Sequence, residues 1–131
     1  MSTKEVLSID SIPTLGLALS VGVKAGRFVQ VSGMAPLDGD GNLVGVGDIE
    51  AQTEQVMKNI GLVLEKGGAT FADVIKTTVY LTDARHFEKM NAIYARYFGD
   101  RPPARATVQV GMMHPDLMIE IEALALLPES E

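Results

Sequence analysis

The stretch PPARATVQV, residues 102–110, contains both a helix break and a strand pattern. Its two prolines end any helix before them, because proline has no amide hydrogen and its ring does not fit inside a helix. Beyond them, the polar residues Arg105, Thr107 and Gln109 alternate with small or apolar residues. This period of two predicts a β-strand with one polar and one apolar face. The stretch therefore marks a helix-to-strand transition and places Arg105 at the start of the strand.

Similar patterns divide the rest of the chain into strands and helices. Strands are predicted over 28–32 (FVQVS), ended by Gly33, over 74–81 (VIKTTVYL) and over 117–126 (LMIEIEALAL), and the pattern near 15–23 allows another. Helices are predicted from the cap Asp48 to Gly67 and, after the cap Asp83, over about 84–98. Their apolar stripes are Val56, Ile60, Val63 and Leu64 in the first helix and Phe87, Met90, Tyr94 and Tyr97 in the second. This order favours an α+β domain, in which two helices pack on one face of a mixed sheet and leave the other face uncovered.

The short loop GMMHPD, residues 111–116, is predicted to join the last two strands as a hairpin. In the register that this loop length favours, Arg105 lies opposite Glu122 and Thr107 lies opposite Glu120. Arg105 is then also diagonal to Glu120, within reach of long side chains. We therefore expect these four residues together on the polar, uncovered face of the sheet.

That polar face allows two interpretations. Antiparallel sheets often have one solvated face, where Arg–Glu pairs are ordinary and stabilise by less than about 1 kcal/mol. Alternatively, Arg105 binds a substrate carboxylate through its guanidinium, and a nearby carboxylate positions a water as a general acid or base. Pattern alone favours the first interpretation, and spacing does not decide between them.

Composition limits the function. The 131 residues are most simply one domain, 1–131, and the absence of cysteine excludes disulfides and thiolate sites. The net charge of −6 argues against nucleic acid as a partner. No apolar stretch approaches the roughly 20 residues of a membrane span, and no secretory signal is seen, so a soluble cytoplasmic protein is expected. The 47% apolar content indicates either a thick core or a second buried face, as in an obligate oligomer.

The sequence carries no self-sufficient catalytic or metal-binding motif. His86 and His114 lie far apart, and no His–carboxylate cluster has the spacing of metal ligands. Ser32 lies outside any G-x-S-x-G elbow, and the glycines form no phosphate loop. The stretch DGDGN at 38–42 lacks the glycine and glutamate of an EF-hand and predicts a turn.

Short motifs in order along the chain point to a known family. They are Val31-Ser32-Gly33, Gln52-Thr53, Asn59-Ile60, Lys76-Thr77-Thr78, Asn91, Tyr97-Phe98, Pro103-Ala104-Arg105 and Glu120-Ile121-Glu122-Ala123. From about residue 16 to 127 the chain resembles the Rid/YjgF family of reactive intermediate deaminases, also described as endoribonuclease L-PSP. The resemblance implies a chorismate-mutase-like α+β homotrimer with sites in the clefts between subunits. It implies hydrolysis of enamines and imines, such as 2-aminoacrylate and 2-iminopropanoate, to a keto acid and ammonia, without metal or organic cofactor.

The resemblance also implies roles for individual residues. Arg105 matches the arginine that grips the substrate carboxylate, and Glu120 matches the glutamate associated with the hydrolytic water. Ser32 and Gly33 match the pair that lines the pocket, and Asn91 matches an asparagine near the site. Because imines hydrolyse unaided, orientation of the substrate and a placed water are enough for such a site to act.

Three positions depart from the family pattern and predict a more apolar pocket. Leu19 stands at a tyrosine position, Met34 where glutamine is common, and Thr107 where cysteine is common. The stretch PARATVQVGMMHPDLMIEI also resembles the branch that acts on 3-aminoacrylate. Alternatives to the 2-aminoacrylate activity are therefore a deaminase of 3-aminoacrylate or a larger amino-dienoic acid, a ribonuclease or translation inhibitor, and a non-catalytic ligand-binding trimer.

Overall fold

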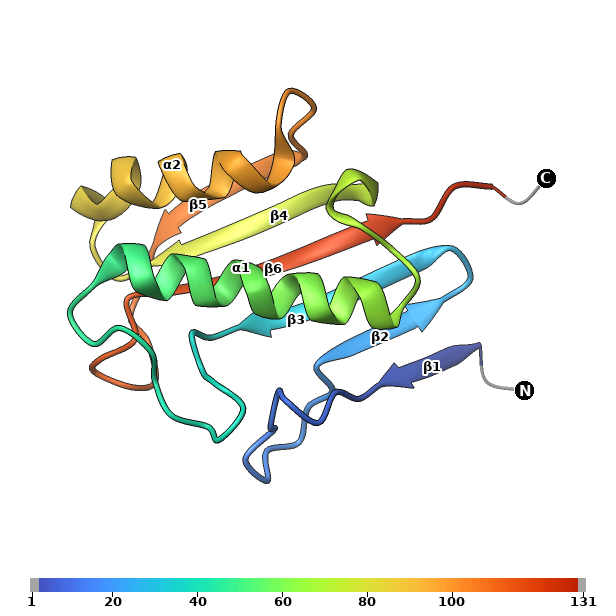
Figure 1. Ribbon diagram of the computed structural model, residues 1–131, viewed down its shortest axis with the longest axis horizontal. Helices are drawn as coiled ribbons and strands as arrows, with labels where there is room; N and C mark the ends of the chain where they lie inside the picture. Colours follow the sequence, from blue (N-terminus) through green and yellow to red (C-terminus); the bar gives the residue numbers. More distant parts are fainter. Residues whose placement is uncertain (1–2, 130–131) are drawn as a thin grey trace.

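The computed structural model describes residues 3–129, which form one six-stranded sheet and two α-helices (Figure 1). In chain order the elements are β1 (Lys4–Leu7), β2 (Gly22–Ala25), β3 (Phe28–Met34), α1 (Ile49–Lys66), a 3-10 helix η1 (Phe71–Asp73), β4 (Val74–Leu81), a 3-10 helix η2 (Ala84–His86), α2 (Phe87–Phe98), β5 (Ala104–Gln109) and β6 (Ile119–Leu126). The strand order is β1-β2-β3-β6-β4-β5, and only the β4–β5 pair is parallel.

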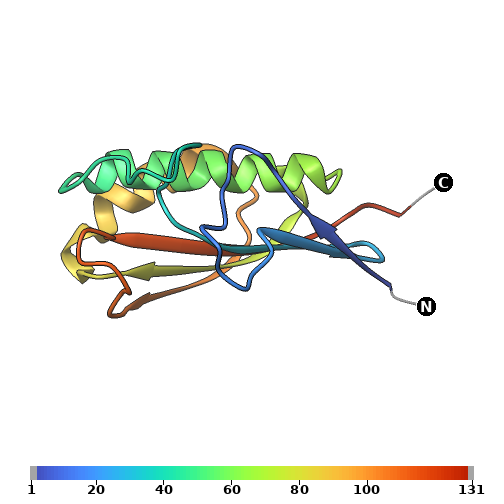
Figure 2. The same ribbon diagram turned by 90° about the horizontal axis from the view of Figure 1, so that it is seen from below.

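Both α-helices lie on the same face of the sheet, and Figure 2 shows the opposite face uncovered. This confirms the predicted α+β architecture with a mixed sheet. The core lies between the two layers, where Val29, Val31 and Ile121 from the sheet pack with the stripe of α1. Within residues 3–129, no helix is both long and apolar enough to cross a membrane.

The first helix begins and ends as its sequence predicts. The Asp48 carboxylate accepts a hydrogen bond from the Ala51 amide at 3.1 Å, which caps α1. The predicted stripe of Val56, Ile60, Val63 and Leu64 is fully buried.

The second helix differs from its prediction at its start. Residues after Asp83 first form the 3-10 helix η2, and α2 begins only at Phe87. In the predicted stripe Met90 and Tyr94 are buried, whereas Phe87 remains 38% exposed.

The strands near the N-terminus also differ from prediction. β3 continues through Gly33 to Met34, beyond its predicted end. A β-bulge between Val31 and Met34 shifts the register with β6, and the pairing resumes at Met34. Residues 15–21 form a loop rather than a strand, and β2 begins at Gly22.

The predicted hairpin between the last two strands is wrong. β4 lies between β5 and β6, so Arg105 is beside Thr77, and Thr77 is beside Ala123. The physical reason is that α2 serves as a crossover and returns the chain as a strand parallel to β4. β6 then runs antiparallel to both β3 and β4 and takes the place between them.

The predicted orientation of β5 is wrong as well. Arg105 and Thr107 align with Thr77 and Val79, which are buried under the helices. The polar side of β5 therefore faces α2, and Ala106 and Val108 face the uncovered side.

A buried glutamine joins α1 to two loops. The Gln52 amide nitrogen donates to the carbonyls of Gly45 at 3.1 Å and Asp116 at 2.9 Å, and its oxygen accepts from the Met118 amide at 2.9 Å. Gln52 is 0% exposed. We expect Gln52→Leu to lower the free energy of unfolding by about 2–4 kcal/mol, because three backbone groups lose their partner.

Urea denaturation measures this change. The matched control is Gln55→Leu on the same helix, which loses one partly exposed hydrogen bond to Asn59. Its expected cost is about 1 kcal/mol or less. Equal losses in the two variants would contradict the proposed role of Gln52.

Candidate active site

The residues that sequence analysis assigned to the site fall into two groups. Arg105, Asn91 and Thr107, with the rings of Phe87 and Tyr94, form what we call the arginine half-site. Leu19, Ser32, Gly33, Met34 and Glu120 form what we call the glutamate half-site.

In the arginine half-site, α2 presents three side chains to Arg105 at helical spacing. Arg105 Nη1 donates to Asn91 Oδ1 at 2.7 Å. The guanidinium carbon lies 4.7 Å from the centroid of the Tyr94 ring and 5.4 Å from that of Phe87. Both distances are those of cation–π contacts. The i, i+4, i+7 spacing of Phe87, Asn91 and Tyr94 places all three on one helix face.

The Tyr94 ring is held in one orientation by a hydrogen bond to β4. Its hydroxyl is hydrogen-bonded to Thr77 Oγ1 at 2.6 Å. Burial raises the pKa of Tyr94, so its phenol stays neutral at physiological pH. The sequence pattern places Tyr94 and Phe87 in the apolar stripe of the helix and indicates no further role for them. Their spacing with Asn91 is the signal that could have identified them as partners of the arginine.

Arg105 is half-buried. No carboxylate among residues 3–129 lies within salt-bridge distance of its guanidinium. A guanidinium has five N–H donors, so donors remain beyond the one given to Asn91. Thr107 follows on the same face and lines a cavity of about 250 Å³ with Phe87 and Gln109. The half-site is thus suited to bind a small anion.

The glutamate half-site is built around the bulge of β3. A Cβ at position 33 would collide with Glu120 Oε1, so glycine is required for this carboxyl to lie against the bulge. Glu120 is half-buried. Burial raises its pKa, and the nearby charge of Glu122 raises it further. A carboxyl in this state can exchange a proton closer to neutral pH than an exposed glutamate.

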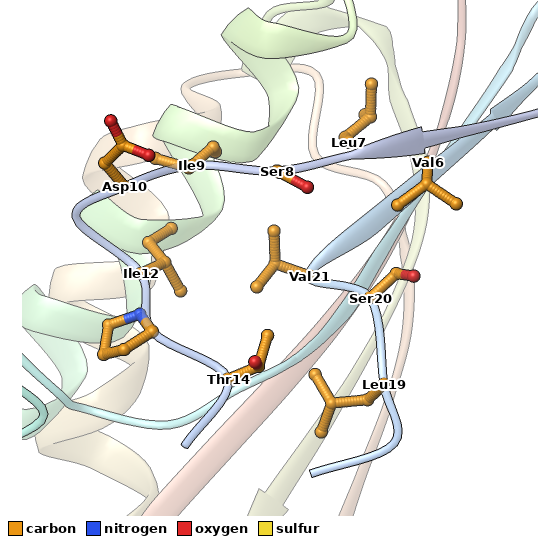
Figure 3. A pocket seen from close by; sticks show the side chains of 11 residues that line it. Val6, Leu7, Ser8, Ile9, Asp10, Ile12, Thr14, Leu19, Ser20 and Val21 are labelled. Atoms are coloured by element: carbon orange, nitrogen blue, oxygen red, sulfur yellow. The ribbon is translucent and has the colours of Figure 1, made fainter. Parts of the chain in front are cut away.

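All five residues of the glutamate half-site line one cavity of about 630 Å³. Leu19 reaches it from the loop between β1 and β2. Figure 3 shows Ile12 and Thr14 on one arm of this loop and Leu19 and Val21 on the other, around a second cavity of about 360 Å³. No group of three or more metal-ligating side chains gathers here or elsewhere in residues 3–129.

The two half-sites are separated within one chain. Two strand steps of about 4.8 Å, roughly 10 Å, divide β5, which carries Arg105, from β6, which carries Glu120, and a third step leads to Ser32 and Gly33 on β3. Moreover, Arg105 shares a face with Ala123, and Glu120 is three residues from Ala123 and therefore on the opposite face. One small substrate cannot touch Arg105 and Glu120 of the same chain.

The raised pKa of Glu120 makes stability depend on pH. Between the ordinary value of 4.5 and the raised folded-state pKa, the folded chain binds more protons than the unfolded chain. Stability therefore falls as pH rises through this window. Glutamine mimics the protonated form, so Glu120→Gln is expected to raise the free energy of unfolding at pH 7 relative to the parent. Below pH 4.5 this gain should vanish, and urea denaturation at pH 4 and pH 7 measures it. A gain that is the same at both pH values would contradict the assignment.

Comparison with known proteins gives consistent matches. The family model described as Endoribonuclease L-PSP matches residues 13–127. The RutC family protein PH0854 of Pyrococcus horikoshii is 44% identical over 122 residues, covering 93% of this chain and 97% of that protein. Reactive Intermediate Deaminase A, chloroplastic, of Arabidopsis thaliana is 40% identical, covering 95% of this chain and 66% of that protein.

Two further matches carry informative names. The 3-aminoacrylate deaminase RutC of Acinetobacter baylyi is 37% identical, covering 93% of this chain and 97% of that protein. Among solved structures, the YjgF gene product from E. coli superimposes with a TM-score of 0.84 at 30% identity, covering 93% of this chain and 98% of that one.

Proposed function

Because the chain belongs to the Rid/YjgF family, whose model is described as Endoribonuclease L-PSP, we propose that it hydrolyses reactive enamine and imine acids to a keto acid and ammonia. The expected substrates are of the 2-aminoacrylate or 2-iminopropanoate type. A substrate such as 3-aminoacrylate is the variant that the name of the Acinetobacter relative supports. The observation that carries the proposal is a half-buried arginine that α2 holds in place and that has no carboxylate partner among residues 3–129.

Arg105 is proposed to bind the substrate carboxylate. Asn91 and the two rings hold the guanidinium in one orientation, so little side-chain entropy is lost when an anion binds. A fork of parallel N–H donors matches the two oxygens of a carboxylate. This contact would fix the position of the reacting carbon next to it.

Glu120 is proposed to act on the hydrolytic water. From the protonated imine, the Glu120 carboxylate takes one proton of the water while the water oxygen bonds to the imine carbon, which gives a tetrahedral carbinolamine. The carboxyl then gives this proton to the amino nitrogen. As the C–N bond breaks, the carboxylate takes the hydroxyl proton, which leaves a C=O group, and passes that proton to the departing ammonia. Because the pKa of Glu120 is raised toward neutral pH, its carboxyl can both accept and donate a proton in this reaction.

A second copy of the chain is proposed to complete each site. The arginine half-site of one chain would face the glutamate half-site of the next chain. Such a contact joins two different surfaces, and when it is repeated around a rotation axis the chains close into a ring. We propose a homotrimer, as the family resemblance implies. The uncovered sheet face supports this proposal, because Val6, Phe28 and Val108 on it are 52%, 48% and 42% exposed.

The experiment that tests the function is ammonia release from freshly generated 2-aminoacrylate and 3-aminoacrylate. Each reaction is compared with a reaction that contains no protein, because both substrates decay unaided. Acceleration of either one supports the proposal and identifies the branch, and acceleration of neither contradicts it. Light scattering at several concentrations tests whether three chains of 14.0 kDa associate.

A further inference from the structure

The cavity of the glutamate half-site is larger than a three-carbon substrate needs. Its volume of about 630 Å³ lies within the range of pockets that enclose ligands of many atoms. We propose that this cavity selects 2-imino and 2-enamino acids with an aliphatic side chain of about leucine size. The inference rests on the proposed function and names the substrate class of the same site.

The walls of the cavity are mostly apolar. Leu15, Leu17 and Leu19 come from the loop between β1 and β2 and remain 59%, 63% and 46% exposed. Met34, which is 4% exposed, also lines the cavity. Leu43 adds a further aliphatic group. An aliphatic ligand would remove these leucines from water, which is favourable in proportion to the area buried.

One wall residue has a strained backbone. Leu15 has a φ of 56°, and it is the only non-glycine residue with positive φ in the described part of the chain. This conformation is uncommon for a leucine and costs free energy. Gly41 leaves the space that the Leu15 side chain occupies, since a Cβ there would lie 2.9 Å from Leu15 Cδ2. Strain of this kind persists where surrounding structure holds it, typically at ligand sites.

Two polar side chains of the cavity, those of Asn59 and His114, are bonded to other groups of the chain. The Asn59 amide donates to the carbonyls of Ala35 and Leu37, and its oxygen accepts from Gln55. His114 Nδ1 accepts from the Asp116 amide. Among the residues that the structure describes, the buried side-chain atoms without a partner belong to Glu54 and His86, which lie outside this cavity. An aliphatic substrate side chain needs no hydrogen-bond partner, which suits a lining that is mostly apolar.

The cavity can select without taking part in the reaction. Ser32, Gly33 and Glu120 lie at its wall, next to where the imine carbon would react. Water adds to that carbon and ammonia leaves, and the side chain passes unchanged into the keto acid. The length of the substrate side chain therefore changes the binding free energy of both the ground state and the transition state. This change appears in kcat/KM.

The test compares imino acids generated in place by an amino-acid oxidase from leucine and from alanine. The kcat/KM of the leucine-derived substrate is expected to be about 50-fold higher than that of the alanine-derived substrate. Each of the three additional carbons is expected to raise kcat/KM about fourfold. Leu17→Asn should lower this ratio about 10-fold, because one wall becomes polar. Val46→Asn is the matched control, since Val46 is 65% exposed and lies outside the cavity, and it should leave the ratio unchanged.

Binding of the stable products separates failure of this inference from failure of the proposed function. Calorimetry compares 4-methyl-2-oxopentanoate with pyruvate, and the larger acid is expected to bind at least about 10-fold more tightly. Hydrolysis with a ratio near one would overturn the inference and leave the function standing. Without hydrolysis, tighter binding of the larger acid would reject the function and still support the selective cavity. Equal binding of the two acids would overturn the inference.

Discussion

Arg105→Ala is expected to reduce kcat/KM for the enamine or imine substrate by about 100- to 1,000-fold, because the bound carboxylate loses its only charged partner in the half-site. Arg105→Lys keeps the charge but loses the planar fork and its stacking on Tyr94 and Phe87. It should therefore recover only part of the loss. Ammonia release at substrate concentrations far below KM measures kcat/KM directly.

The matched control is Arg101→Ala. Arg101 is an exposed arginine just before the prolines, four residues from Arg105. It should retain full activity and thereby exclude a general effect of lost positive charge. Circular dichroism and thermal unfolding of each variant establish that the fold is intact. Activity of Arg105→Ala close to that of the parent would reject the role of Arg105 as the carboxylate anchor.

The helices and most strands could be predicted because their signals are local. Asp48 and its hydrogen bond to the Ala51 amide begin α1, and the apolar stripe of α1 follows from helical spacing alone. β4 matches its predicted range because a continuous β-branched run is distinctive. The short β1 was missed, since only the last of its four residues is buried.

Strand order could not be predicted in the same way. The loop from 110 to 118 has the length of a hairpin connection, yet it carries the chain past the end of β4. Which strands pair is decided by contacts between distant segments, and here α2 decides it by returning β5 parallel to β4. Alternation correctly grouped Arg105 with Thr107, but it could not say that their side would face a helix. That depends on Asn91 and Tyr94, which give the guanidinium its partners.

The site residues came from family resemblance, and their arrangement came from the structure. Resemblance named Arg105 and Glu120 together without indicating that they lie on opposite faces of one sheet. The distinction matters chemically, because a water held by Glu120 can attack only a carbon close to it. An intermolecular site resolves this separation, and it can be tested without a structure of the assembly.

Two inactive variants are expected to restore activity when they assemble together. Arg105→Ala chains keep an intact glutamate half-site, and Glu120→Gln chains keep an intact arginine half-site. In a mixed ring, a cleft is complete wherever the intact Arg105 of one chain meets the intact Glu120 of the next. Random assembly of equal amounts makes about one cleft in four complete, so co-expression should give about a quarter of the parent activity.

A site within one chain gives a different result, because every chain then carries a defect and the mixture stays as inactive as its parents. Co-expression of Arg105→Ala with Asn91→Ala provides the internal control. Both substitutions affect the arginine half-site, so each chain has one defective half-site of the same kind. Every cleft in that mixture contains a defective arginine half-site. The activity of the mixture should therefore not rise above the average of the two parents. Recovery in the first mixture but not in the second would show that Arg105 and Glu120 act from different chains.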